Sequence, residues 1–258
     1  MVARFGTTSA WQAKEDEFMS SPRTLARVAG LLYLMMFVCA TFAGFVRSRI
    51  IDSSDPAATA DNIRASATLF RVGFVADLVQ VTFLLLAAMA LYLLLRHVNQ
   101  LAAQAMVTFV AVAVAIYCLN LLNQYTALRI ATDQGYTRAF GRAGSDQLVL
   151  QFADMQHSGY YIAAMFFGLW LLPLGYLVIT SGYVPRVLGV LLIIGGVGYL
   201  VDLLVRFLAP GFDAGISPLV IPGAVAELSL AAWLLVKAVR VPAPDPPVSD
   251  LAQAGRGS

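Results

Sequence analysis

Apolar residues along the chain fall into long runs that are separated by short polar or charged stretches. A helix needs about 20 mainly apolar residues to cross a bilayer. Several runs have about this length, and we therefore predict six membrane-spanning helices, over residues 28–46, 72–95, 98–128, 158–179, 186–208 and 218–237. The pattern indicates an all-α fold, a six-span transmembrane helical bundle.

The connections between these runs differ in length. Only a few residues separate the second run from the third and the fourth from the fifth, so each pair is expected to form a tight hairpin on the same face. The connections over residues 47–70 and 130–157 are longer and are expected on the opposite face. In the first of them, Asp55-Pro56 followed by residues 57–64 predicts a short capped helix with proline in its first turn.

The spans divide the chain into a 1–22 N-terminal tail, a 23–240 transmembrane domain and a 241–258 Pro-rich tail that is expected to be disordered. The first run is too long for the core of a cleaved signal peptide and is expected to stay as an anchor. An even number of spans places both termini on one face. That face is predicted to be cytoplasmic because four basic residues flank the terminal spans, namely Arg23, Arg27, Lys237 and Arg240.

The composition supports a membrane protein and limits the classes of molecule that it is expected to bind. Hydrophobic residues make up 59% of the 258 residues, charged residues make up 12%, and the mean hydropathy is +0.76. A soluble domain carries about 25% charged residues. The net charge of +2 and the lack of a basic run argue against nucleic acid. The two cysteines, Cys39 and Cys118, lie inside apolar runs and do not form a disulfide scaffold. The expected partners are membrane lipids.

Polar side chains recur inside the predicted spans at helical spacing. Charged groups in such positions are costly and normally face a bundle interior or a cavity. With a rise of about 1.5 Å per residue, these groups fall into the same half of the membrane. We therefore predict a polar pocket that opens toward the face opposite the termini. Its candidate residues are Asp77, Gln80, Asn120, Asn123, His157, Tyr160, Tyr199, Asp202, Arg206 and Glu227.

Some of these residues have a simpler interpretation. Asp202 and Arg206 are spaced i, i+4 and can neutralise each other on one helix. The Asn120 group can serve as hydrogen-bonding glue between helices. Asp77 and Glu227 are interpreted as isolated acids on different spans, which favours the pocket. The glycines of residues 195–198 are expected to allow tight helix packing rather than nucleotide binding, since no strand precedes them.

Metal and catalytic motifs do not support a specific chemistry. His97 and His157 are expected on opposite faces of the membrane, which excludes zinc or haem ligation by two histidines of one chain. We expect no cofactor and no metal site. His157 together with the acids leaves open an intramembrane enzyme that uses acid–base catalysis.

Several sequence blocks resemble a known family. They are RVAGLLYL (27–34), ALYLLLR (90–96), FFGLW (166–170), LGYL (174–177), SGYVPRVLGVL (181–191), GYLVD (198–202) and ELSLAAWLL (227–235). Together they cover about residues 22–240 and resemble the bacterial membrane family known as domain of unknown function 4386. The resemblance implies a six-span integral protein of the bacterial plasma membrane, and it implies no activity, cofactor or catalytic residue.

Three function classes follow from the sequence. The first is a protein that binds or transports a small molecule or ion through the polar pocket. The second is the intramembrane enzyme, and the third is a structural or regulatory membrane partner whose polar groups serve assembly alone. We place binding or transport first, because several spans carry polar groups at a common depth.

Overall fold

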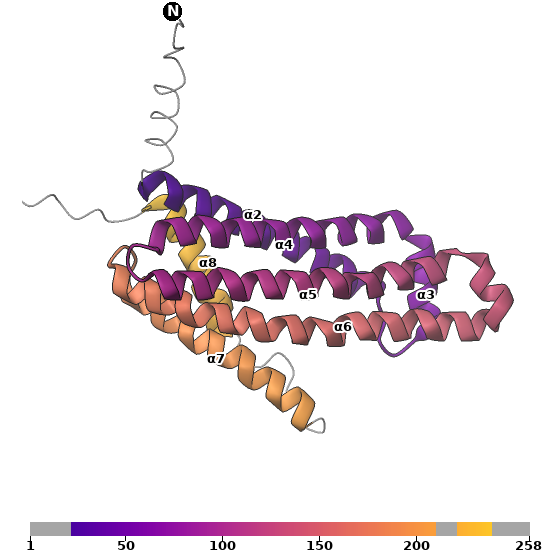
Figure 1. Ribbon diagram of the computed structural model, residues 1–258. Helices are drawn as coiled ribbons and strands as arrows, with labels where there is room; N and C mark the ends of the chain where they lie inside the picture. The colour runs from indigo at the N-terminus through magenta and orange to yellow at the C-terminus, as the bar shows by residue number, and fades with distance from the viewer. Residues whose placement is uncertain (1–21, 210–220, 239–258) are drawn as a thin grey trace, which may run out of the picture.

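The computed structural model describes residues 22–209 and 221–238, and all the regular structure in these two ranges is helical. Figure 1 shows an elongated bundle. The described helices are α2 (Pro22–Ile50), α3 (Pro56–Ala65), α4 (Ala67–Leu95), α5 (Gln100–Thr132), α6 (Gln134–Ser181), α7 (Arg186–Leu208) and α8 (Ile221–Val236). The predicted tails lie outside the described residues, apart from Pro22, which begins α2.

The predicted spans agree with the helices to different degrees. Helix α7 has the predicted bounds, and α2 and α4 extend a few residues beyond the apolar run. Helix α5 begins two residues after the predicted start and ends four residues after the predicted end. Five helices, α2, α4, α5, α6 and α7, are long and apolar enough to cross a membrane. The described part of α8 has 16 residues, which is about 24 Å of helix. The sixth span therefore stays a prediction, because residues 218–220 lie outside the described range.

The expectation of a long loop over residues 130–157 is wrong. Helix α5 continues to Thr132, and α6 begins at Gln134 and runs for 48 residues. Gly141, at φ +71°, interrupts α6 and redirects the chain near its start. The polar residues that suggested a loop instead form a helix with a buried stripe that includes Ser145 and Val149. The connection between α2 and α4 is likewise mostly helical.

The short helix predicted after Asp55 is confirmed as α3. The Asp55 carboxylate accepts a hydrogen bond from the Ala58 amide at 2.9 Å, and Pro56 occupies the first turn. Arg64 fixes α3 to α6 through an ion pair with the buried Asp146, and its Nε donates to the Ala131 carbonyl at 2.9 Å. Burial acts to lower the pKa of Arg64, but hydrogen bonds from Arg64 to Asp146 and Asp61 outweigh it and raise the pKa above its usual value.

We expect Asp55→Ala to loosen α3 without unfolding the bundle. The variant leaves the Ala58 amide without its cap, and loss of an N-cap costs about 1 kcal/mol. Hydrogen–deuterium exchange of the α3 amides in detergent should therefore become faster. The exposed Ser53→Ala is the matched control and should exchange like the parent. Equal α3 protection in the Asp55 variant and the parent would show that tertiary contacts alone hold α3.

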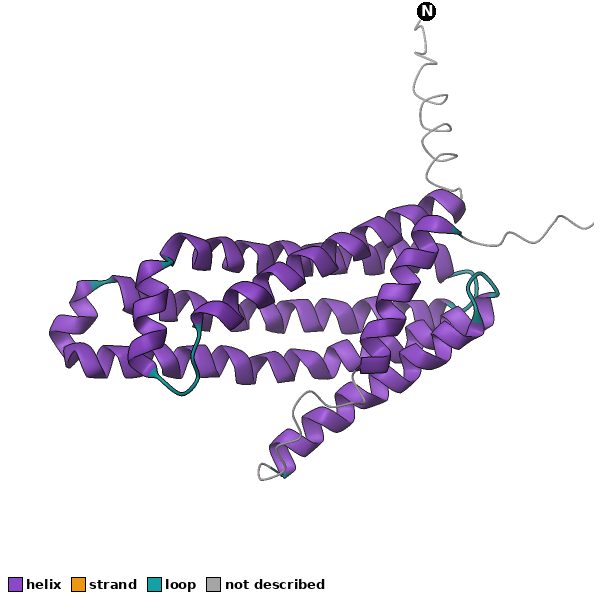
Figure 2. Cartoon of the chain, turned by 180° about the vertical axis from the view of Figure 1, so that it is seen from behind, coloured by secondary structure: helices purple, strands orange, loops and turns teal. Residues whose placement is uncertain are grey.

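The six longer helices form a closed ring. In ring order they are α2, α4, α5, α6, α7 and α8, and α8 packs against α2 to complete it. Helix α3 lies across one end of the ring (Figure 1). The α4–α5 and α6–α7 turns lie together at the other end, where the Tyr183 hydroxyl contacts His97 Nε2 at 3.2 Å. This contact confirms the prediction that the two hairpins share a face, and Figure 2 shows the same arrangement from behind.

Close approach of backbones holds α7 in the ring. Gly195 of α7 lies directly against Gly223 of α8, so that a Cβ on either glycine would overlap the other's backbone. Gly196 of α7 lies in the same way against the Gly168 carbonyl of α6. The predicted role of these glycines in tight helix packing is confirmed for Gly195 and Gly196. These contacts bring the interior face of α8 next to α7 and position Glu227 one turn after Gly223.

Candidate functional site

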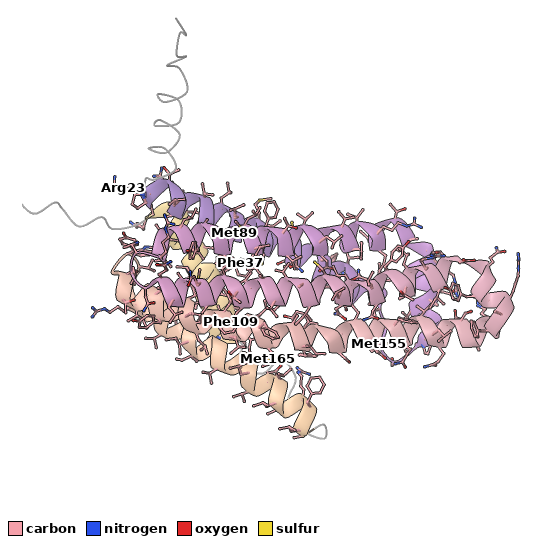
Figure 3. All side chains as sticks on the ribbon, in the orientation of Figure 1. Arg23, Phe37, Met89, Phe109, Met155 and Met165 are labelled. Carbon is pink, nitrogen blue, oxygen red and sulfur yellow. The ribbon has the colours of Figure 1, made fainter. Side chains whose placement is uncertain are left out.

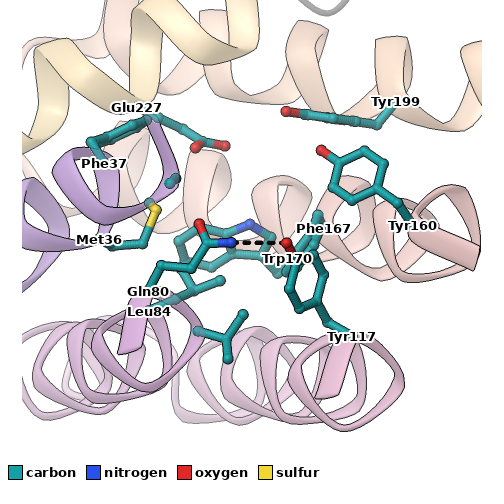
Figure 4. A pocket seen from close by; sticks show the side chains of 12 residues that line it. Met36, Phe37, Gln80, Leu84, Tyr117, Tyr160, Phe167, Trp170, Tyr199 and Glu227 are labelled. Carbon is teal, nitrogen blue, oxygen red and sulfur yellow. Dashed lines mark hydrogen bonds between the residues drawn. The ribbon is translucent and has the colours of Figure 1, made fainter. Parts of the chain in front are cut away.

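A cavity of about 230 Å³ lies inside the ring of helices. Each of α2, α4, α5, α6, α7 and α8 contributes at least one side chain to its wall, as Figure 4 shows for most of them. The lining residues are Met36, Phe37, Ala40, Gln80, Val81, Leu84, Tyr117, Tyr160, Phe167, Trp170, Tyr199 and Glu227. The ring therefore encloses a single space to which six separate segments of the chain converge.

Six of the twelve residues that line the cavity are aromatic. Trp170 is almost fully buried and packs edge-on against Tyr33, with ring centroids 5.9 Å apart. Tyr117 lies edge-on to Tyr160 at 6.2 Å and tilted to Phe167 at 6.4 Å. Such edge-on pairs restrain one another's rings. The aromatic wall is therefore a packed and largely preformed surface.

Among the described residues that line the cavity, Glu227 supplies the one carboxyl group. Its side chain is 9% exposed, and it lies beside the hydroxyl of the buried Tyr33. In Figure 4 the carboxyl of Glu227 and the hydroxyls of Tyr160 and Tyr199 point toward the same part of the cavity. In the described residues Arg206 pairs with Asp202, and no ion pair joins Glu227 to an arginine.

Asp77 lies behind the cavity wall in a hydrogen-bonded network. It is fully buried and forms an ion pair with Arg47 of α2. The Tyr117 hydroxyl donates to Asp77 at 2.7 Å, and Gln80 Nε2 donates to Asp77 and to the Tyr117 oxygen, each at 2.9 Å. The interpretation of Asp77 as an isolated acid is wrong, because α2 continues past its apolar run and brings Arg47 to it.

The other predicted residues lie apart from the cavity wall. The buried Asn120 donates to the Gln156 carbonyl of α6 at 2.7 Å and accepts from Asn123 at 3.0 Å, the bonding expected of interhelical glue. Asp202 accepts from Arg206 at 3.0 Å, so this pair is neutral as a unit. The exposed His157 contacts only the Tyr161 hydroxyl, at 3.3 Å, among the hydrogen bonds of the described residues.

Four predicted residues line the cavity, Gln80, Tyr160, Tyr199 and Glu227, whereas sequence reasoning missed four aromatic residues of its wall, Phe37, Tyr117, Phe167 and Trp170. Trp170 carries no signal in the sequence that separates a cavity wall from ordinary helix packing. One available signal was overlooked. Tyr117 precedes Asn120 by three residues and Gln124 by seven, so it shares their polar helix face.

Phe37 separates the cavity from the outer surface. It lines the cavity and also a shallow apolar groove on the outside of α2 and α8. Its ring stacks on Tyr33 with centroids 5.3 Å apart. The other residues of this outer groove are Leu34, Val38, Thr41, Phe42, Phe45 and Leu228.

The outside of the bundle is apolar. Large hydrophobic side chains such as Leu31, Met89 and Leu119 are at least half exposed, and Figure 3 shows Met89, Met155 and Met165 along the outside of the helices. A soluble protein rarely exposes so large an apolar surface. With five helices long enough to cross a bilayer, these features define a helical membrane protein with a partly polar interior.

Comparison with known proteins identifies the family. Residues 28–238 match the family model described as domain of unknown function (DUF4386), so the chain belongs to this family. The chain is also 31% identical over 152 residues to an uncharacterised protein of Archaeoglobus fulgidus; the match covers 58% of this chain and 74% of that protein. No solved structure matches the chain.

Proposed function

We propose that the protein spans the plasma membrane six times, with both termini in the cytoplasm, and binds a small amphipathic molecule in the cavity of the helix ring. The observation that carries the proposal is the convergence of all six longer helices on one cavity with a mostly apolar wall. A carboxyl, an amide and tyrosine hydroxyls are placed on that wall at a few defined points. Small-molecule sites typically combine these two features.

The volume of the cavity limits the size of the ligand. This volume is about 230 Å³. Pockets for drug-sized ligands occupy about 300–1,000 Å³. The proposed ligand is therefore a compact molecule rather than a whole phospholipid.

The geometry favours binding over an acid–base enzyme. His157 would be the general base of the enzyme hypothesis, yet it is exposed and is not part of the cavity wall. A catalytic base must reach the reacting group within hydrogen-bonding distance, directly or through one water. A purely structural role for the polar groups is distinguished from binding by the following experiment.

We expect Ala40→Phe to abolish binding by filling the cavity from α2. The full chain in detergent is heated with small aromatic amines, alcohols and hydrocarbons. A compound present at 100 times its Kd stabilises the parent by about 2.7 kcal/mol, which raises the unfolding midpoint by several degrees. The filled variant should show no such rise. Ala115→Phe, on the exposed face of α5, is the matched control and should respond like the parent.

The proposed function would be wrong if no compound raised the midpoint of the parent. It would also be wrong if every compound that raises the midpoint of the parent raised the midpoints of Ala40→Phe and Ala115→Phe equally. Either result would leave the polar groups with a role in assembly alone.

A further inference from the structure

We infer that the ligand of the cavity is a small organic cation, such as an alkylated ammonium with an apolar body, and that Glu227 and the surrounding aromatic rings recognise its charge. The inference rests on the proposed function and specifies the chemical class of the ligand. It follows from three properties of the cavity wall, which are its charge, its hydrogen-bonding groups and its aromatic content.

The first property is an uncompensated acid. Glu227 is the one ionisable acid among the twelve lining residues, which include no arginine, lysine or histidine. The other buried or half-buried acids of the described residues already have cationic partners: Asp77 pairs with Arg47, Asp146 with Arg64, and Asp202 with Arg206. Tyr33, beside Glu227, is a neutral group. A charged ligand that complements this wall therefore carries a positive charge.

The second property is an excess of acceptors. The Nε2 group of Gln80 is already used by Asp77 and Tyr117, which leaves its Oε1 on the cavity side (Figure 4). The Glu227 carboxyl and the hydroxyl oxygens of Tyr160 and Tyr199 face the same space. These groups suit a ligand that donates hydrogen bonds or carries positive charge.

The third property is the aromatic wall. Cations are attracted to the faces of Trp, Tyr and Phe rings within about 6 Å. The six aromatic side chains of the wall lie on α2, α5, α6 and α7 and line the same cavity as Glu227. The chain uses the same interaction next to the cavity, where the Arg206 guanidinium lies 4.3 Å from the centre of the Tyr161 ring.

A bare inorganic ion fits this wall poorly. Hard cations such as Ca²⁺ take about six to eight oxygen ligands at close range. The cavity is much larger than one ion, and most of its wall consists of carbon atoms from Met, Leu, Val and aromatic side chains. An organic cation satisfies the acid and fills the apolar volume at the same time.

The test compares two probes of the same shape. Benzyltrimethylammonium carries the positive charge, and neopentylbenzene replaces its nitrogen with carbon. Binding of each probe to the full chain in detergent is measured by thermal shift and calorimetry. For each probe, the ratio of affinities between variant and parent is independent of the probe's own partition into the detergent.

We expect Glu227→Gln to lower the affinity for the cation by about tenfold to a hundredfold, as loss of an interaction with a charged group predicts. The affinity for the neutral probe should change by less than about threefold, because the substitution conserves shape. Asp154→Asn removes an exposed acid from α6 and is the matched control for net charge; it should bind both probes like the parent.

If Glu227→Gln does not fold, Glu227→Asp takes its place. This variant keeps the charge but shortens the side chain by one methylene. It should therefore weaken binding of the cation and leave binding of the neutral probe unchanged. An equal effect on both probes, or none on the cation, would overturn the inference. The proposed function would still be supported if the parent bound the neutral probe and Ala40→Phe abolished that binding. Failure of both probes to bind the parent would also overturn the inference, and the wider compound panel would then decide the proposed function.

Discussion

Arg47→Met is expected to lower the free energy of unfolding by about 3–5 kcal/mol, the largest effect of any substitution considered for this chain. The variant removes the cationic partner of Asp77, whose side chain is fully buried. Gln80 and Tyr117 still donate hydrogen bonds to Asp77, but neither carries a charge. An uncompensated carboxylate would then remain inside the bundle, where its desolvation is costly.

A double variant distinguishes the lost pair from lost packing. Adding Asp77→Asn to Arg47→Met removes the stranded charge and keeps a similar shape, so the double variant should be more stable than Arg47→Met alone. Chemical unfolding in detergent, followed by circular dichroism, measures the coupling between the two sites. The exposed Arg49→Met, two residues further along α2, should cost little and is the matched control. If the losses in free energy of unfolding caused by Arg47→Met and Asp77→Asn simply added in the double variant, this account of the pair would be wrong.

Gly195→Ala is expected to destabilise the bundle by about 3 kcal/mol, the upper end of the usual cost of overpacking. The new Cβ would meet the backbone of Gly223, and a backbone cannot move aside as the end of a flexible side chain can. The α7–α8 contact must therefore open to accept the methyl group. Because this contact helps to position Glu227, the variant should also bind any ligand of the cavity more weakly.

Gly44→Ala gives the opposite expectation and serves as the control. Gly44 lies within α2, and a Cβ there would meet no atom within 4 Å. Alanine is favoured over glycine inside a helix by up to about 1 kcal/mol, so this variant should match or exceed the stability of the parent. Thermal unfolding of both variants in the same detergent makes the comparison. Equal midpoints for the two would show that α7 and α8 separate easily at Gly195.

The sequence predicted the helices better than the connections between them. Apolar runs of about 20 residues define a span almost directly, and α7 has the predicted bounds. The polar character of residues 130–157 favours a loop, although polar helices project beyond a membrane as easily as loops do. Asp55 revealed α3 because an N-cap is a local signal that needs no tertiary information.

The site was harder to predict for a physical reason. Glu227 and Gln80 attract attention because polar groups are costly in an apolar span. Trp170 incurs no such cost, and the ring order of the helices decides whether it faces lipid, another helix or the cavity. Arg47 directly follows the predicted span 28–46, and its pairing with Asp77 depends on how far α2 continues and on its packing against α4.

Phe37 lies between the cavity and the apolar outer surface of the bundle, whereas a water-filled binding pocket opens to solvent. The same ring borders the cavity on one side and the apolar groove of α2 and α8 on the other. A ligand that passes this ring arrives from the hydrocarbon layer, so its occupancy depends on moles of ligand per mole of lipid rather than on its aqueous concentration. Two compounds with equal intrinsic affinity but different solubility in the bilayer would then occupy the protein to different extents. A change in lipid composition alone would alter occupancy without altering any contact within the cavity.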